Sequence, residues 1–443
     1  MTVTIISNVR LFDGTNVHDK ARVTFDSDSG TILEVNTSPD ASSVDPSANS
    51  KATTIDGAGH TLLPGLIEAH VHVYDLHLPP GADHSQVLRT PLKCGVTTIC
   101  DMHSDPDTIL NFRRDIKEDV EAARKGKGTV SLCDLKSSLY GATIEGGWPK
   151  PIVLAHEPSD ELKAKVSKWP SLTPSNASDF IASHKSTGAD YIKLMQENCC
   201  SLALPTNSIP VASLETQTAV VNAAHKANLL VVGHATSRES TEIVLNSGAD
   251  GLTHTFIDQS PTEDIIELYK KNNAFVIPTL VVLSSLTNEL QDLREKYAKI
   301  ASEHLGVIDD FTKQTMVEFL GMKAPQCAIE HGFETIRMFR KHGVDVVAGT
   351  DSAAGLKGTG IGPSLWMELE LYVERCGMSV IEALRSATGV SADRFRFDDR
   401  GKVEVGRRAD LVLVKGDPTE RLDDFWDKEK GIQGVWKLGW KAI

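Results

Sequence analysis

The chain has 443 residues, of which 40% are hydrophobic, 24% charged and 6% aromatic, a composition typical of a soluble globular protein. This length exceeds what one small core requires, so we expect a large α/β domain with an additional domain. The formal net charge of −14 argues against nucleic acid or an anionic membrane surface as a partner, because both are polyanions.

The cysteines and the N-terminal residues indicate where in the cell the chain is expected to be. The seven cysteines include no CxxC pair, a pattern that indicates reduced thiols in a cytoplasmic protein. The N-terminus shows neither the basic start nor the apolar run of a signal peptide, and no window has the roughly 18 apolar residues that cross a bilayer. We therefore expect a cytoplasmic chain that acts on a small-molecule substrate.

Both ends of the chain have the pattern of short β-strands. The first sixty residues contain β-forming runs separated by Gly, Asp, Asn and Ser, with a polar loop at 37–52. The end of the chain has the same rhythm, as in "ADLVLVKGDP" and "GVWKLGWKAI". We predict that residues 1–61 and 400–443 together form a small β-sandwich domain.

Residues 62–399 alternate short apolar runs with amphipathic segments, such as the helix candidates at 213–228 and 240–248. Eight runs have the pattern of strands: 62–75, 97–103, 129–135, 190–195, 229–235, 250–256, 274–282 and 344–351. Apolar strands alternating with helices are typical of a parallel sheet. Eight such units in about 300 residues predict a (β/α)₈ TIM barrel.

Residues 284–343 interrupt this alternation. The segment is long, charged and largely helical in pattern, and "SSLTNELQDLREKYAKIASEHLG" is its clearest helix. One interpretation is a solvated pair of surface helices. The other is a helical insertion that acts as a lid or as an oligomer contact.

Polar residues of ligand type recur at the predicted strand ends. Side chains two apart in a strand point to the same side, so His70 and His72 project together. The C-terminal ends of the later strands, where barrels carry their chemistry, bear four more residues: Lys193, His234, His254 and Asp351. A single histidine there is usually only a satisfied polar residue, and Asp351 alone could be a helix N-cap. Together the six predict a metal centre.

Lys193 is the unusual member of this set. A lysine inside an apolar strand costs free energy unless it is neutralised, and its ammonium would repel nearby metal cations. The conflict disappears if the amine has reacted with carbon dioxide to form a carbamate. This anionic group has two oxygens and can bridge two metals.

The sequence resembles the metal-dependent amidohydrolase superfamily, in the binuclear subtype with a carboxylated lysine. The resemblance rests on "LPGLIEAHVH", "AGTD" and "GKVEVGRRADLVLVKGDP", covers essentially the whole chain, and its spacing from lysine to histidines is similar to the prolidase and ochratoxinase-like branch. It implies two divalent metal ions, with zinc suited to these donors. In this assignment His70, His72 and Asp351 hold the buried metal, His234 and His254 hold the exposed one, and carboxylated Lys193 bridges them.

The same resemblance implies the reaction. Two metals would share a bridging hydroxide and polarise a carbonyl, and Asp351 would act as the catalytic base that passes a proton to the leaving nitrogen. The expected function is hydrolysis of the amide (C–N) bond of a small peptide-like, N-acyl amino acid or urea-like compound. Family analogy also implies a homo-oligomer.

Two loops depart from the pattern of that branch. Its members tend to carry Gly-Gly-His after the third strand, where this chain has Gly146, Gly147 and Trp148. After the fourth strand, their Gly- and Ser-rich loop is replaced by "QENCCS" at 196–201. The substrate therefore cannot be carried over from the family.

Several loop residues are candidates for contact with substrate. Trp148 and Tyr140 could stack on an aromatic or apolar group, or could only anchor their loop. His103, at the end of the second strand, is a candidate substrate-binding residue or a structural histidine. His77 and His84 are weaker candidates.

Three alternatives stay open at this stage. A mononuclear deaminase of the same superfamily is weakened by Lys193 and by the absence of His-x-x-Glu after the fifth strand. A non-catalytic scaffold of the same fold is disfavoured because no ligand of the set is missing. A thiol nucleophile at Cys199 or Cys200 lacks a supporting His-Asn pattern.

Overall fold

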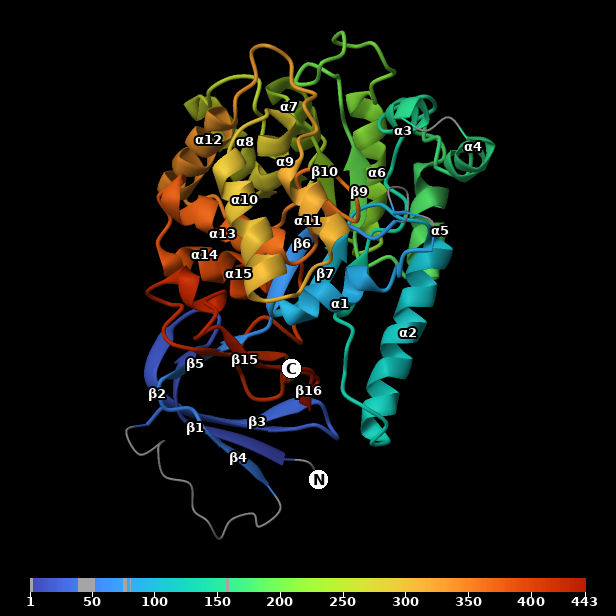
Figure 1. Ribbon diagram of the computed structural model, residues 1–443. Helices are drawn as coiled ribbons and strands as arrows, with labels where there is room; N and C mark the ends of the chain where they lie inside the picture. Colours follow the sequence, from blue (N-terminus) through green and yellow to red (C-terminus); the bar gives the residue numbers. More distant parts are fainter. Residues whose placement is uncertain (1–2, 39–51, 75–77, 80, 157–158) are drawn as a thin grey trace.

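The computed structural model describes residues 3–38, 52–74, 78–79, 81–156 and 159–443. Figure 1 shows a body of strands surrounded by helices above a smaller sheet, in which strands from both ends of the chain lie together. The predicted loop at 37–52 falls almost entirely, and His77 entirely, outside the described residues.

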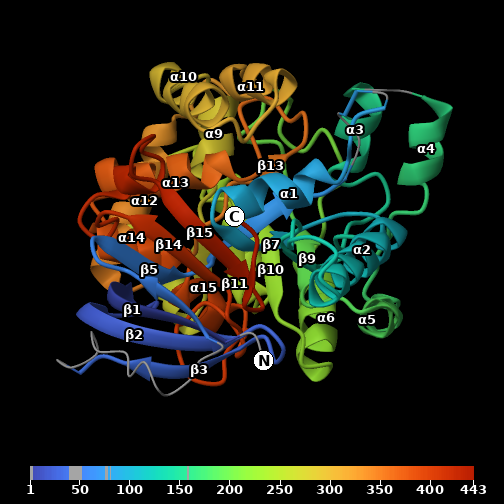
Figure 2. The same cartoon turned by 60° about the horizontal axis from the view of Figure 1, so that its bottom comes forward.

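The smaller part is one mixed sheet of eight strands, ordered β16-β15-β14-β5-β1-β2-β3, with β4 paired to β1 (Figure 2). Its strands are β1 (Val3–Phe12), β2 (Val17–Asp26), β3 (Thr31–Asn36), β4 (Thr53–Asp56), β5 (His60–Pro64), β14 (Leu411–Lys415), β15 (Ile432–Lys437) and β16 (Trp440–Lys441). The two chain ends thus share a sheet, as the sequence indicates. Because β5 pairs with both β1 and β14, the strands form one hydrogen-bonded sheet. The β-sandwich over residues 1–61 and 400–443 stays a prediction.

This sheet has its own apolar core. Val9 and Phe25 from the N-terminal strands pack in one buried cluster with Leu411 and Trp436 from the C-terminal strands. The Phe25 and Trp436 rings meet edge to face with 5.8 Å between centroids. Burial of side chains from both ends joins these two distant segments of the sequence.

The larger part contains two parallel four-stranded sheets, β13-β6-β7-β8 and β12-β11-β10-β9. Their bounds are β6 (Leu66–His72), β7 (Val96–Asp101), β8 (Asp134–Ser137), β13 (Ser352–Ala353), β9 (Ile192–Met195), β10 (Val231–His234), β11 (Gly251–Thr253) and β12 (Phe275–Ile277). The central strands are buried along nearly their whole length. This is the arrangement expected of parallel strands covered by helices.

Hydrogen bonds connect the edges of the two sheets. On one side Ala142 pairs in parallel with Leu194, and on the other Val276 pairs with Val346. The predicted strand at 344–351 is not continuous, because after Val347, which still donates to the Val276 carbonyl, its backbone turns to other partners, including the carbonyl of His70. Closure into an eight-stranded barrel stays a prediction.

Helices flank the strands (Figure 1). They are α1 (Gln86–Lys93), α2 (Pro106–Arg124), α3 (Lys150–His156), α4 (Asp160–Val166), α5 (Ala177–Thr187), α6 (Leu214–Lys226), α7 (Arg238–Asn246), α8 (Glu263–Lys271), α9 (Leu280–Leu286), α10 (Gln291–Lys299), α11 (Asp310–Val317), α12 (Ile329–His342), α13 (Pro363–Glu374), α14 (Val380–Ser386) and α15 (Gly389–Arg394). The helices predicted at 213–228 and 240–248 are α6 and α7. The side chain of Ser213 caps α6 by accepting from Thr216 N, and Val220, Val221 and Ala224 form its buried stripe.

The segment 284–343 is helical, as its sequence indicates, but it is not a solvated helix pair. On α10, Arg294 and Tyr297 are buried. Arg294 donates to the carbonyls of Val281 and Gly358, which fastens α10 to α9 and to the loop after β13. On α12, Ile329, Phe333 and Ile336 are buried, as in an ordinary helix of the α/β body. The additional residues are therefore those between α9 and α12.

All seven cysteines are free thiols. Within the described residues, no helix has both the length and the hydropathy that crossing a membrane requires.

Candidate metal centre

Two histidines and one aspartate meet where β6 ends. His70 is fully buried on β6, and the next alternate residue, His72, has 15% of its side chain exposed. Asp351 precedes β13, which pairs with β6. Asp351 Oδ1 lies 3.1 Å from His70 Nε2 and 2.9 Å from His72 Nε2. Ligand atoms of the three residues all lie within 4.8 Å of one another.

The local backbone brings Asp351 to this position. Asp351 N donates to the His70 carbonyl at 2.8 Å, and Gly349 runs so close that a Cβ there would lie 2.8 Å from His70 N. Asp351 itself has a φ of 60°, a left-handed conformation that costs a non-glycine residue about 1 kcal/mol or more. Such strain persists where the surroundings impose it, and here it aims a carboxylate at two imidazoles.

Two further histidines extend the cluster. The His254 ring lies 5.2 Å from that of His70, and the His234 ring lies 4.7 Å from that of His254, measured between centroids. His70 and His72 are 5.3 Å apart by the same measure. The four imidazoles therefore form a continuous row from β6 to β10 and β11.

Lys193 completes the set on β9. Its side chain is buried, and its Nζ donates to Thr253 Oγ1, a neutral hydroxyl. Burial lowers the pKa of Lys193 to about 7, although Asp351 and Asp101 attract the charged form. The positive charge of Lys193 in turn opposes protonation of His70, His234 and His254. All six residues predicted from the strand ends thus lie in one cluster.

The protonation states suit metal binding. Burial lowers the pKa of His70 to about 3, lowers that of His254 well below its usual value, and lowers that of His234. Burial alone would raise the pKa of Asp351, but the adjacent His70 and His72 outweigh it and hold this pKa well below its usual range. The centre therefore offers neutral imidazoles and an ionised carboxylate, the forms that bind metals.

Several buried nitrogen and oxygen atoms of the proposed ligands lack hydrogen-bond partners among the described residues, as expected of atoms that bind a cation. His70 Nδ1, His70 Nε2 and Asp351 Oδ1 are buried and have no hydrogen-bond partner of acceptable geometry within the described ranges. Buried polar atoms are almost always hydrogen-bonded, so such a group needs an explanation. Nitrogen and carboxylate donors converging on one point fit a divalent cation such as zinc.

Two neighbours orient the second pair of histidines, and sequence reasoning did not identify either. Thr279 Oγ1 donates to the Pro278 carbonyl and lies 2.7 Å from His254 Nδ1. Because the hydroxyl proton is already used, His254 Nδ1 donates to Thr279, and Nε2 stays free for a metal. The buried carboxylate of Glu197 lies 3.1 Å from His234 Nε2. Neither contact leaves a signal in the sequence, because each joins a histidine at the end of one strand to a loop that follows another strand.

The three candidate substrate-contact residues have different surroundings. His103 is buried, and its Nδ1 accepts from Gly141 N at 2.8 Å. Its Nε2 is buried and has no partner within the part of the chain that the structure describes. The Tyr140 hydroxyl donates to Asp105, so Tyr140 anchors its loop. Trp148 stacks on His234, with ring centroids 5.2 Å apart and planes 20° apart.

The weaker candidates have structural roles. His84 Nε2 lies 2.7 Å from the Val73 carbonyl, which only a ring N–H can satisfy. Burial and neighbouring carboxylates raise the pKa of the Cys199 and Cys200 thiols. A raised thiol pKa disfavours a thiolate nucleophile.

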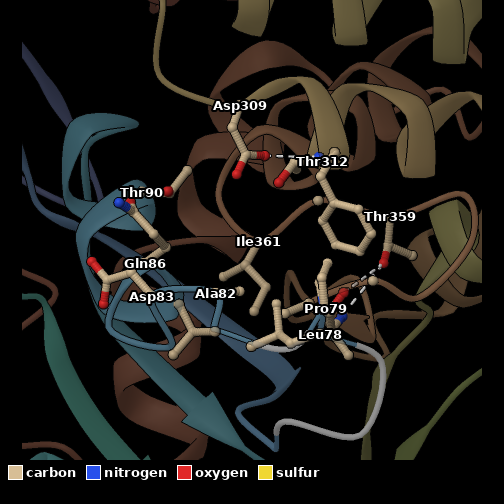
Figure 3. Close-up of a pocket in the computed structure, with 16 residues that line it drawn as sticks. Leu78, Pro79, Ala82, Asp83, Gln86, Thr90, Asp309, Thr312, Thr359 and Ile361 are labelled. Atoms are coloured by element: carbon tan, nitrogen blue, oxygen red, sulfur yellow. Dashed lines mark hydrogen bonds between the residues drawn. The ribbon is translucent and has the colours of Figure 1, made fainter.

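A cavity of about 190 Å³ lies beside the centre. Figure 3 shows residues from three segments around it. Leu78, Pro79, Asp83 and Thr90 come after β6, Asp309 and Thr312 lie at the start of α11, and Thr359 and Ile361 follow β13. Ala353 forms part of the wall and pairs with His72 in the β13–β6 ladder. The cavity is therefore linked to the centre through Ala353, and its described lining includes none of the six proposed ligands.

The chain is similar to known proteins of one family. A family model described as the amidohydrolase family matches residues 61–440. The ochratoxinase of Aspergillus niger is 26% identical over 260 residues, which cover 57% of this chain and 46% of that protein. The match thus spans about half the length of this curated relative.

Solved structures resemble the chain over almost its whole length. A Xaa-Pro dipeptidase with bound methionine has a TM-score of 0.71 at 22% identity and covers 99% of each chain. Phenylurea hydrolase B has a TM-score of 0.72 at 18% identity and covers 99% of this chain and 96% of its own. At these identities the likeness shows the fold, an α/β body with an additional domain.

Proposed function

The chain belongs to the amidohydrolase family, and we propose that it is a metal-dependent hydrolase that cleaves the amide (C–N) bond of a small compound. The substrate class is peptide-like, N-acyl amino acid or urea-like. The observation that carries this proposal is the convergence of a row of four imidazoles, one carboxylate and one buried lysine.

The residues divide into two sets of ligands. His70, His72 and Asp351 would hold one divalent cation, and the close approach of their donor atoms supports this assignment. His234 and His254 would hold a second. Zinc suits these nitrogen and carboxylate donors, and the cations would supply Lewis acidity that lowers the pKa of water and polarises the substrate carbonyl.

Lys193 would join the two sets as a carbamate. Its amine nitrogen would form a bond to the carbon of CO₂ and release one proton to solvent. The neutral amine is the form that reacts, and the pKa of about 7 makes it available near neutral pH. The resulting anion would replace a buried cation, which relieves the electrostatic conflict with two metals.

Asp351 would move the proton. Its Oδ1 faces His70 and His72, which leaves Oδ2 to take a proton from the attacking water and to deliver it to the leaving nitrogen. His103 would contribute a substrate contact. Because its Nδ1 accepts from Gly141 N, its neutral ring carries the proton on the unpartnered Nε2, which can donate to a substrate oxygen.

The cavity in Figure 3 suggests where a substrate side group would lie. Its volume of about 190 Å³ exceeds that of an apolar cavity of about 150 Å³ that accommodates benzene. Its lining within the described residues includes Asp83 and Asp309 and no cationic side chain. We infer that it takes a neutral group of about the size of a phenyl ring and disfavours a carboxylate.

A hydrolysis screen tests the proposed function. Purified protein would be assayed with amides, carboxypeptidase-type substrates and ureas, before and after treatment with a chelator. We expect hydrolysis of one class, loss of that activity with the chelator, and recovery after zinc is restored. Activity that survives complete metal removal, or no hydrolysis of any class by the zinc-loaded protein, would overturn the proposal.

Assembly is a separate proposal. By analogy with its family, the chain would form a homo-oligomer, and residues between α9 and α12 would serve either as the contact or as a lid. Sedimentation at several concentrations distinguishes an oligomer from a monomer.

A further inference from the structure

Two loops, one after β8 and one after β9, meet at one residue. Glu197 belongs to the segment 196–201, and Trp148 belongs to the loop after β8. Both contact the imidazole of His234, Glu197 at a ring nitrogen and Trp148 at a ring face. Both loops therefore form the surroundings of a single proposed metal ligand.

The carboxylate of Glu197 is held firmly. It is buried, its Oε1 accepts from Cys199 N at 2.7 Å, and its Oε2 accepts from the hydroxyl of Thr236 at 2.6 Å. The same Oε2 lies 3.1 Å from His234 Nε2. Since an ionised carboxylate can only accept, His234 Nε2 carries a proton, and Nδ1 is left with the lone pair.

Trp148 restricts the same ring from a second direction. Its indole lies nearly parallel to the imidazole, with centroids 5.2 Å apart and planes 20° apart. His254 approaches the imidazole edge to face, with centroids 4.7 Å apart and planes 81° apart. The two aromatic contacts hold the plane of the His234 ring. A flip within that plane would move Nε2 away from Glu197, so the contact with Glu197 selects the orientation of the ring.

We propose that Glu197 and Trp148 form a clamp that fixes His234 so that its Nδ1 binds the second metal ion. The clamp rests on the proposed function for the statement that His234 binds a metal ion. It also predicts, independently of any metal, that the proton of the His234 ring is on Nε2. Partners outside the first ligand shell fix the tautomer of a metal-binding histidine, and their loss typically weakens metal binding about 10- to 100-fold. Glu197 and Trp148 are thus positioning residues that tune the second metal position.

Glu197→Gln is the most direct test. Glutamine has one oxygen, so it cannot accept from both Cys199 N and Thr236, and its amide N–H would favour the wrong tautomer of His234. Trp148→Ala removes the stacked ring. Glu239→Gln is the matched control, because Glu239 lies in the same region, is exposed and accepts from Asn198, but does not contact His234.

Two measurements separate the clamp from the proposed function. Titration with zinc should show that Glu197→Gln weakens one of two sites about 10- to 100-fold, that Trp148→Ala weakens the same site, and that Glu239→Gln binds like wild type. Unchanged affinity at both sites in Glu197→Gln would overturn the clamp. Absence of any metal binding by the wild type would instead refute the proposed function.

The second measurement determines which nitrogen of the His234 ring carries the proton. Nitrogen NMR of the histidine side chains, assigned with a His234→Asn variant, should show the proton of His234 on Nε2 in the wild type and in Glu239→Gln. It should shift toward Nδ1 in Glu197→Gln. A proton on Nδ1 in the wild type would overturn the clamp whether or not a metal is bound, and circular dichroism checks that each variant is folded.

Discussion

Thr279→Val should weaken metal binding while leaving the fold intact. Thr279 Oγ1 lies 2.7 Å from His254 Nδ1, so valine replaces the acceptor with a methyl group of similar size. Loss of a neutral hydrogen bond costs about 1 kcal/mol, and the buried His254 N–H left without a partner adds a penalty of similar size. We expect a loss of about 1–3 kcal/mol in the free energy of unfolding and a 10- to 100-fold loss in affinity for the second metal.

Thr279→Ser is the matched control. Thr279 has a φ of 54°, a left-handed conformation that is unfavourable for a β-branched residue. Serine keeps the hydroxyl and removes the branch, so it should match or slightly exceed the wild type in stability. Denaturant unfolding and zinc titration would be measured on both variants. If Thr279→Val and Thr279→Ser bind zinc equally well, Thr279 does not orient His254.

Three further predictions concern the proton carrier, acid stability and the cavity. Asp351→Asn should fold normally by circular dichroism but lose about 10²- to 10⁴-fold in kcat, because its amide cannot accept and return a proton. In metal-free protein, His103→Gln should reduce the loss of unfolding free energy that the wild type shows as the pH falls. Burial lowers the pKa of His103 to about 3, so between about pH 6.5 and 3 the unfolded chain binds a proton that the folded chain does not. The wild type therefore loses stability as the pH falls through that window. An equal loss of unfolding free energy with falling pH in His103→Gln and wild type would contradict this. Ala354→Leu, which narrows the cavity, should lower kcat/KM for phenyl-bearing substrates about tenfold and spare methyl-bearing ones, and equal effects on both would exclude the cavity as the side-group site.

The parts of the centre that follow from strand periodicity could be predicted from the sequence. His70 and His72 project together because they alternate on one strand, and His234 and His254 lie near them because parallel strands end at the same edge. Lys193 lies two residues before the end of β9, where it pairs with Val232. These relations depend on short-range patterns and on one topological rule. They need no knowledge of how the loops fold.

The rest depends on contacts between loops, for which the sequence carries no periodic signal. Glu197 lies in a segment without hydrophobic alternation, and its partners lie on another strand and after it: His234 ends β10, and Thr236 follows it. The continuous strand expected over 344–351 also does not form, because the residues that carry Asp351 bond to His70 and Ser386 in place of a regular ladder. Tyr140 anchors its loop through Asp105, a partner 35 residues away that no local pattern indicates.

The metal content of the intact protein tests the central claim most directly. Protein loaded with zinc and bicarbonate, then freed of unbound metal, should retain about two zinc ions per chain by elemental analysis, as the two sets of ligands predict. Lys193→Ala should retain fewer, because its bridging group is removed. A wild-type ratio near zero would contradict the metal centre, and a ratio near one that is unchanged in Lys193→Ala would contradict the binuclear assignment.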